Sequence, residues 1–180
     1  MKRLLTVLVL SSLLTSLMAL SIKDIQYTED ASGDSPYKDQ IVTVSGEVTA
    51  EPYAFDGKTF FIQDSIGMWS GIMVYHSAIP ADLLIAEGDW VTVTGKVKEY
   101  SGVTEITDIS ALTIDQTGVF SIKPIDVTTA EVATGGANAE ACEGVLVRVK
   151  DVDITSEMTS YGEWNVSDGS GDLMVDDKAK

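Results

Sequence analysis

The sequence has few of the side chains that most often carry out chemistry in proteins. Its 180 residues include one histidine, His76, and one cysteine, Cys142. A single histidine leaves no histidine pair for a metal ion, and a single cysteine excludes an intrachain disulfide. The chain also lacks a G-x-S-x-G elbow, a P-loop and a dinucleotide-binding fingerprint. We therefore expect a binding protein with no catalytic site, no metal and no cofactor.

Basic residues are scarce as well. The chain has 12 lysines and arginines against 28 aspartates and glutamates, and its net charge is −16. The segment 40–115 contains eleven acidic residues and three basic ones, which are Lys58, Lys96 and Lys98. Such a charge favours solubility and repels polyanions. Electrostatics therefore opposes a ligand that is rich in phosphate.

The acidic residues near the end of the chain raise the question of a cation site. Carboxylate oxygens are the ligands that calcium prefers. The acidic residues concerned are Asp168, Asp172, Asp176 and Asp177. Their spacing differs from the fixed spacing of a known calcium loop. We interpret them as solvated turn residues.

Long apolar runs are absent except at the start of the chain. Lys2 and Arg3 precede an apolar run over residues 4–20, which is too short and wrongly flanked for a membrane span but typical of a secretory signal. The small residues Ala19 and Ser21 favour cleavage near residue 21, and an uncleaved anchor is the alternative. We expect a signal peptide, a mature chain with a charge of −18, and a secreted extracellular or periplasmic protein with no membrane association after cleavage.

The chain after the apolar run shows a regular alternation of apolar and polar residues, which is the pattern of half-buried strands. Valine occupies alternate positions of the segment 41–49, and Gly46 interrupts the set. A glycine inside a strand marks a bend, which lets one long strand serve both sheets of a small barrel. The strands that we expect, in order, are 41–49, 59–64, 69–75, 90–100 and 103–112.

The fourth of these strands repeats the first, because VTVTGKV of residues 91–97 matches VTVSGEV of residues 42–48. We expect antiparallel strands that close into a barrel, with a short helix within residues 77–88. The side chains predicted to fill the barrel are Val42, Val44, Ile62, Val74, Val91, Val93 and Val97.

The pattern starts again in the last third of the chain. Thr128 to Glu131 is a capping box, and laying Val44 on Val149 brings Asp64 within one residue of Asp168. A repeat of that accuracy indicates a second copy of the unit. Its strands stop after the third, so we expect the sequence to be a fragment of a longer protein. These strands are 145–152, 164–168 and 173–175.

Several motifs resemble those of one family: Ser35-Pro36-Tyr37, Val42-Thr43-Val44-Ser45-Gly46, Phe61-Ile62-Gln63-Asp64, Trp69-Ser70-Gly71-Ile72, Gly88-Asp89 and the segment Tyr100 to Ile106. Over about residues 21–115 the sequence is similar to OB-fold modules of bacterial secreted proteins, which often accompany extracellular nuclease or phosphatase domains. The resemblance implies an all-β protein, with a five-stranded OB-fold Greek-key barrel followed by the first three strands of a second OB-like unit. The expected domains are a signal peptide (1–21), the OB-fold domain (22–115), a connector (116–127) and the incomplete second unit (128–180).

OB-folds bind oligonucleotides or oligosaccharides on strands two and three and in the loops after strands one and four. The aromatic residues at those positions are Tyr53, Phe55, Phe61, Trp69, Tyr75 and Tyr100. Each stacked base contributes about 1 to 3 kcal/mol, although large aromatics also serve as core in a barrel. The resemblance favours a non-catalytic module that binds single-stranded nucleic acid or an oligosaccharide beside downstream domains of the same protein. The alternative is a structural spacer, or a glycan- or protein-contact module of a cell-surface protein.

Overall fold

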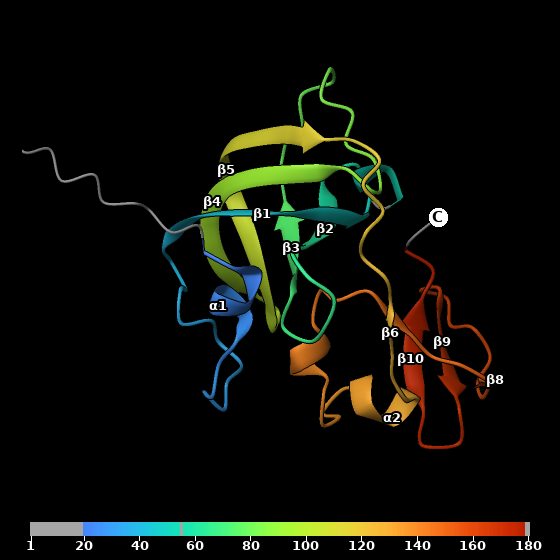
Figure 1. Cartoon of the computed structure of the whole chain (residues 1–180). Coiled ribbons are helices and arrows are strands. Elements are labelled where there is room, and N and C mark those ends of the chain that lie inside the picture. Colours follow the sequence, from blue (N-terminus) through green and yellow to red (C-terminus); the bar gives the residue numbers. More distant parts are fainter. Residues whose placement is uncertain (1–19, 55, 179–180) are drawn as a thin grey trace, which may run out of the picture.

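The computed structural model describes residues 20–178 except residue 55 (Figure 1). All but the last two residues of the predicted signal peptide lie outside the described residues. In the described part of the chain, no helix is both long and apolar enough to cross a membrane. The helices and strands described are α1 (Ile22–Gln26), β1 (Ile41–Ala50), η1 (Pro52–Ala54), β2 (Thr59–Gln63), β3 (Gly71–Tyr75), β4 (Trp90–Tyr100), β5 (Val103–Gln116), β6 (Ile125–Asp126), α2 (Thr129–Val132), η2 (Glu140–Cys142), β7 (Val147–Arg148), β8 (Asp153–Ile154), β9 (Glu163–Ser167) and β10 (Leu173–Asp176).

The strands β1, β2, β3, β5 and β4 close into a barrel in that order, which is the OB-fold topology that the sequence predicts. β1 is shared, because residues 41–47 pair with β4 and residues 47–50 pair with β2. Gly46 lies where the strand changes partner, and a Cβ there would come 2.8 Å from the carbonyl oxygen of Gln63. The predicted role of a glycine in this bent strand is therefore confirmed.

One pairing in the barrel differs from the expected antiparallel arrangement. β3 and β5 run parallel, with Met73 beside Glu105. The Greek-key path causes the difference, since β4 returns antiparallel to β1 and the β4–β5 hairpin then carries β5 along β3 in the same direction. β5 is also longer than predicted, because it continues to Gln116. The second half of β5 pairs with the first half of β4.

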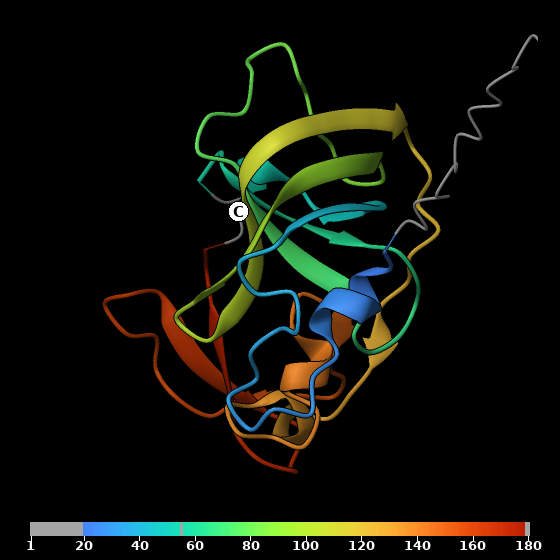
Figure 2. The same cartoon turned by 90° about the vertical axis from the view of Figure 1, so that its left-hand side faces the viewer.

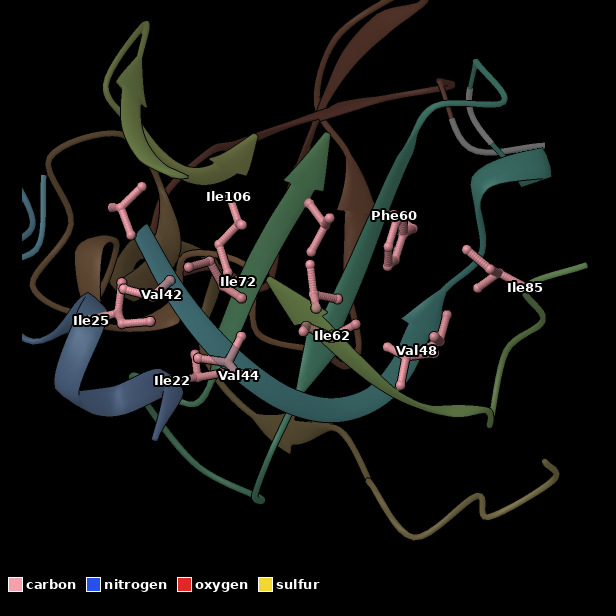
Figure 3. Packing of buried hydrophobic residues seen from close by; sticks show 14 residues of the cluster. Ile22, Ile25, Val42, Val44, Val48, Phe60, Ile62, Ile72, Ile85 and Ile106 are labelled. Atoms are coloured by element: carbon pink, nitrogen blue, oxygen red, sulfur yellow. The ribbon is translucent and has the colours of Figure 1, made fainter. Parts of the chain in front are cut away.

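The interior of the barrel is filled by side chains from all of its strands (Figure 3). Ile22 and Ile25 of α1 close one end of this core, and Ile85 closes the other (Figure 3). All the side chains that were predicted for the core are buried, namely Val42, Val44, Ile62, Val74, Val91, Val93 and Val97.

The segment 77–88, where we expected a short helix, contains none. It is a series of turns, in which the Ala78 N–H donates to His76 Nδ1 (3.3 Å) and the Ala86 N–H donates to Asp89 Oδ2 (2.9 Å). This path carries Ile85 into the core, where the side chain is 1% exposed. In Figure 2 the segment stands above the barrel, far from α1, so the helix that plugs this barrel comes from the start of the fold instead.

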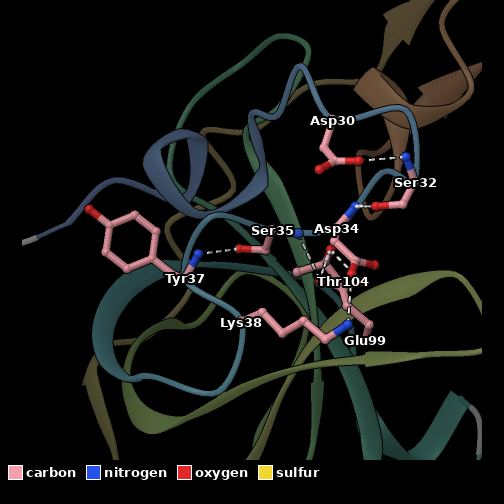
Figure 4. A network of polar contacts seen from close by, with 8 residues as sticks. All are labelled: Asp30, Ser32, Asp34, Ser35, Tyr37, Lys38, Glu99 and Thr104. Carbon is pink, nitrogen blue, oxygen red and sulfur yellow. Dashed lines mark hydrogen bonds and ion pairs between the residues drawn. The ribbon is translucent and has the colours of Figure 1, made fainter.

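The loop that follows α1 is held on the barrel by Glu99 (Figure 4). The Glu99 carboxylate accepts the Ser35 N–H at 2.8 Å and the Thr104 hydroxyl at 3.1 Å. The Ser35 hydroxyl donates in turn to the Ile25 carbonyl oxygen at 2.6 Å. These bonds fix the position of α1 relative to β4 and β5.

The second unit repeats the first in outline. β9 and β10 form a hairpin as β2 and β3 do, and β8 pairs with β9 as β1 pairs with β2. In both units an aspartate that follows the first strand of the hairpin holds the start of a short helix. Asp64 accepts the Ile22 N–H at 2.7 Å, and Asp168 accepts the Thr129 N–H at 3.1 Å. The two bonds occupy corresponding places in the two units, and the second OB-like unit stays a prediction.

The strand expected at 145–152 is broken into smaller pieces. β7 and β8 are each two residues long and flank Asp151, whose φ of 52° does not fit a strand. β7 pairs in parallel with β6, so the first strand of the second unit is replaced by two short pairings.

The connector between the units is tied to the barrel by Glu47, which is 3% exposed. Its carboxylate accepts the Ser121 N–H at 2.7 Å, the Ser121 hydroxyl at 2.6 Å and the Ile122 N–H at 3.2 Å. A buried carboxylate needs such donors, because burying an unpaired charge is costly. Residues 121 and 122 are thereby fixed against β1.

Candidate functional site

The outer face of β2, β3 and β5 carries the side chains that alternate with the core. Phe61 lies opposite Met73 and Thr59 lies opposite Tyr75, while Met73 is also beside Glu105. Their neighbours along β2 and β3 are fully buried in the barrel. The period of two therefore places Phe61, Met73 and Tyr75 together on the outside.

One end of this face is a cavity of about 300 Å³ lined by Tyr75, Tyr100 and Glu105. Tyr100 is 67% exposed and ends β4, and the following Ser101 and Gly102 both have positive φ in the tight turn to β5. Burial raises the pKa of the Glu105 carboxyl, while the charge of Lys98 acts in the opposite direction. Two tyrosines and a carboxyl thus meet at this end.

A cavity of about 430 Å³ lies at the middle of the face, lined by Phe61, Met73, Thr59, Asp56 and Lys178. Asp56 shapes the loop between β1 and β2, because its Oδ1 accepts the N–H groups of residues 58 and 59, each at 2.8 Å. Lys178 comes from the segment after β10, so both units contribute to this cavity.

Phe61 also borders a cavity of about 230 Å³ that lies against residues 144–146 of the second unit. The Leu146 N–H donates to Gln63 Oε1 at 2.6 Å, and a Cβ at Gly71 would overlap the carbonyl of Gly144. This close approach makes residues 144–146 a fixed wall. We call the three cavities together the aromatic groove; its lining includes Phe61, Met73, Tyr75, Tyr100, Glu105, Asp56, Thr59, Lys178, Thr49, Ala50 and residues 144–146.

The aromatic residues predicted for the site do not all lie in the groove. Phe61, Tyr75 and Tyr100 line it, and Tyr53 is 55% exposed in η1, within the loop between β1 and β2. Phe55 lies outside the described residues. Trp69 lies at the junction with the second unit: its N–H donates to the Ala141 carbonyl oxygen at 2.6 Å, and its ring meets Tyr27 edge to face at 5.4 Å.

Sequence reasoning missed two kinds of lining residue. Glu105 follows from the alternation of β5 once the parallel register with β3 is known. Lys178 and residues 144–146 have no local signal, because their place beside Phe61 depends on how the second unit packs on the barrel.

The lysines of β4 are each paired with an aspartate. Lys96 is 3.6 Å from Asp39, and Lys98 is 3.0 Å from Asp108. Exposed pairs of this kind contribute at most about 1 kcal/mol, so both lysines can exchange their partners for a ligand. The barrel nevertheless has more acidic than basic residues around the groove.

Metal-ligating residues are not grouped in the part of the chain that the structure describes, where no three His, Cys, Asp or Glu side chains could hold one ion. Asp168, one of the acidic residues near the end of the chain, is bound by Ser170 and Thr129. Hydrogen bonds from these two residues hold its pKa well below the usual range. Its carboxylate supports the turn after β9.

Comparison with known proteins adds one sequence relative and a set of distant structural ones. No protein-family model matches the chain. Endonuclease YhcR of Bacillus subtilis (strain 168) is 31% identical over 139 residues, which are 76% of this chain. The chain spans only 11% of the length of that endonuclease.

Among solved structures, the telomere capping protein Ten1 from Saccharomyces pombe has a TM-score of 0.37 and 14% identity, covering 53% of this chain and 78% of Ten1. The second OB-fold domain of replication protein A from Methanococcus maripaludis has a TM-score of 0.35 and 22% identity, covering 48% of this chain and 92% of that domain. The strand order of the barrel itself identifies the first unit as an OB-fold.

Proposed function

We propose that the chain is a non-catalytic OB-fold module of a secreted multidomain protein, and that it binds single-stranded nucleic acid beside an extracellular nuclease. The observation that carries the proposal is the aromatic groove, in which Phe61, Tyr75 and Tyr100 lie on the ligand-binding face of an OB-fold. The similarity to a short part of an endonuclease supports a place beside a nuclease.

The domain organisation is part of the same proposal. It consists of a signal peptide at 1–21, an OB-fold domain at 22–115, a connector at 116–127 and an incomplete second unit at 128–180. In support, β5 ends at Gln116 and a new helix cap begins at Thr128. Export places the module outside the cytoplasm, where it would meet extracellular nucleic acid.

Stacking supplies most of the affinity in this proposal. Aromatic contacts are worth about 1 to 3 kcal/mol per base, whereas phosphate contacts need lysine or arginine. With a net charge of −16, we expect a salt slope of at most about two, since each phosphate contact adds about 0.7 on a single strand. A divalent cation should strengthen binding where carboxylates lie near the phosphates.

The test is a titration of labelled single-stranded DNA with the chain over a salt series, with and without calcium or magnesium. Tyr100→Ala should weaken binding by about 5- to 150-fold, the equivalent of one lost stack. Tyr161→Ala is the matched control, because Tyr161 is 82% exposed in the second unit and does not line the groove.

The acidic surface favours a second candidate, which is a spacer or a glycan- or protein-contact module. No binding at high micromolar protein in any condition would put that candidate ahead. Equal losses in Tyr100→Ala and Tyr161→Ala would show that the groove is not the binding site.

A further inference from the structure

The largest of the three cavities of the aromatic groove is built by both units. Phe61 and Met73 of the barrel form its apolar floor, and Lys178 of the second unit stands at its rim. The Lys178 side chain is 78% exposed. Its ammonium therefore reaches solvent at the mouth of the cavity.

The Lys178 ammonium is also easily released from its present partner. Nζ lies 3.0 Å from Asp176 Oδ2, and exposed pairs of this kind contribute at most about 1 kcal/mol. Lys96 and Lys98 of β4 are paired with Asp39 and Asp108, and neither is among the described residues that line the three cavities. Among the described residues that line the largest of the three cavities, Lys178 carries the positive charge.

The cavity offers an apolar floor, the Lys178 cation and the Asp56 carboxylate, and its floor and cation match the base and the phosphate of a nucleotide. The flat face of a base packs on aromatic and thioether side chains, and the anionic phosphate pairs with an ammonium group. Residues 144–146 limit the groove beyond Phe61, because hydrogen bonding to Gln63 and the contact of Gly144 with Gly71 hold them there.

We infer that the second unit completes the nucleic-acid site: Lys178 contacts a phosphate of a strand whose base lies over Phe61 and Met73, and residues 144–146 close the groove at that end. This inference rests on the proposed function and adds to it a defined phosphate contact.

The experiment compares the salt slope of single-stranded DNA binding for the unmodified chain, Lys178→Ala and Lys150→Ala. Lys150 is a matched control, because it also belongs to the second unit and also pairs with an aspartate, at 2.6 Å from Asp126. Both variants remove one positive charge. We expect the slope to fall by about 0.7 in Lys178→Ala and to stay unchanged in Lys150→Ala.

The outcomes separate the two hypotheses. If the unmodified chain binds and Lys178→Ala keeps its slope, or if both variants lose the same amount, Lys178 is not the phosphate contact and the inference is wrong while the proposed function stands. If the unmodified chain does not bind DNA at all, both are wrong.

Discussion

At the scale of single residues, Glu143 couples the second unit to the barrel in a way that depends on pH. Its carboxylate accepts the Thr104 N–H at 2.7 Å. Burial raises its pKa to about 7, against a lowering by the Thr104 hydrogen bond, and the nearby carboxylates of Glu140 and Glu99 add to the rise. The folded protein therefore holds a proton that the unfolded chain releases near pH 4.5.

The sign of the effect follows from linkage. A carboxyl with a raised pKa stabilises the fold below about pH 4.5, and this stabilisation is lost as pH rises to about 7. We expect Glu143→Gln to be more stable than the unmodified chain at pH 8, with the difference vanishing near pH 4.5. Denaturant unfolding at several pH values measures this difference.

Glu157→Gln is the control for that series, because Glu157 is exposed on the second unit. His76, whose pKa is lowered by burial, gives the opposite pH dependence, but it does so equally in all three proteins. A stability difference between Glu143→Gln and the unmodified chain that does not change with pH would contradict the prediction.

At the scale of elements, both units use an aspartate to hold the start of a short helix, Asp64 in the first and Asp168 in the second. Asp64→Ala removes a charged acceptor from the Ile22 N–H at the end of the barrel. Hydrogen bonds to charged groups contribute about 1.5 to 3 kcal/mol, so we expect a loss of that size in the free energy of unfolding. Urea unfolding followed by circular dichroism measures it.

Asp82→Ala serves as the matched control, because Asp82 is exposed in the segment 77–88. It should change stability by less than about 0.5 kcal/mol. Equal effects of the two substitutions would mean that the hydrogen bond from Ile22 to Asp64 does not stabilise the fold.

The elements also show which parts of the fold a sequence can predict. The barrel strands were predictable because valine at every second position places all the valines on one face of a strand, and that face must be buried. Gly46 marked the bend. The segment 77–88 was predicted wrongly, because Ile85 enters the core from a turn rather than from a helix. The break at Asp151 depends on a positive φ that the alternation of residues does not indicate.

The candidate site was predictable only in part, for the same reason. Phe61 and Tyr75 follow from strand parity, and Tyr100 follows from the β4–β5 turn. Trp69 has the same local pattern as a groove residue, yet its ring packs on Tyr27 and its backbone N–H donates to Ala141 of the docked second unit. Lys178 enters the groove through the same docking, which no local pattern indicates.

At the scale of the whole molecule, the excess of acidic residues should make stability depend on salt. The 28 acidic residues repel one another more than the 12 basic ones can offset. Raising sodium chloride from about 10 mM to about 200 mM shortens the Debye length from about 30 Å to below 10 Å. We expect the melting temperature to rise over this range in differential scanning calorimetry.

Potassium chloride should give the same curve, because screening depends on ionic strength and not on the identity of the cation. A melting temperature that falls with salt would mean that the ion pairs outweigh the general repulsion.

The bonds of Glu47 have a consequence for the order in which the protein is made and folds. Its carboxylate in β1 accepts hydrogen bonds from donors that lie 74 and 75 positions later in the chain. During synthesis the barrel strands emerge before residues 121 and 122, so until those residues follow, the Glu47 carboxylate lacks the donors that it has in the fold. Loop closure over such separations slows folding, so we expect the barrel to reach its full stability only when the first residues of the connector are present.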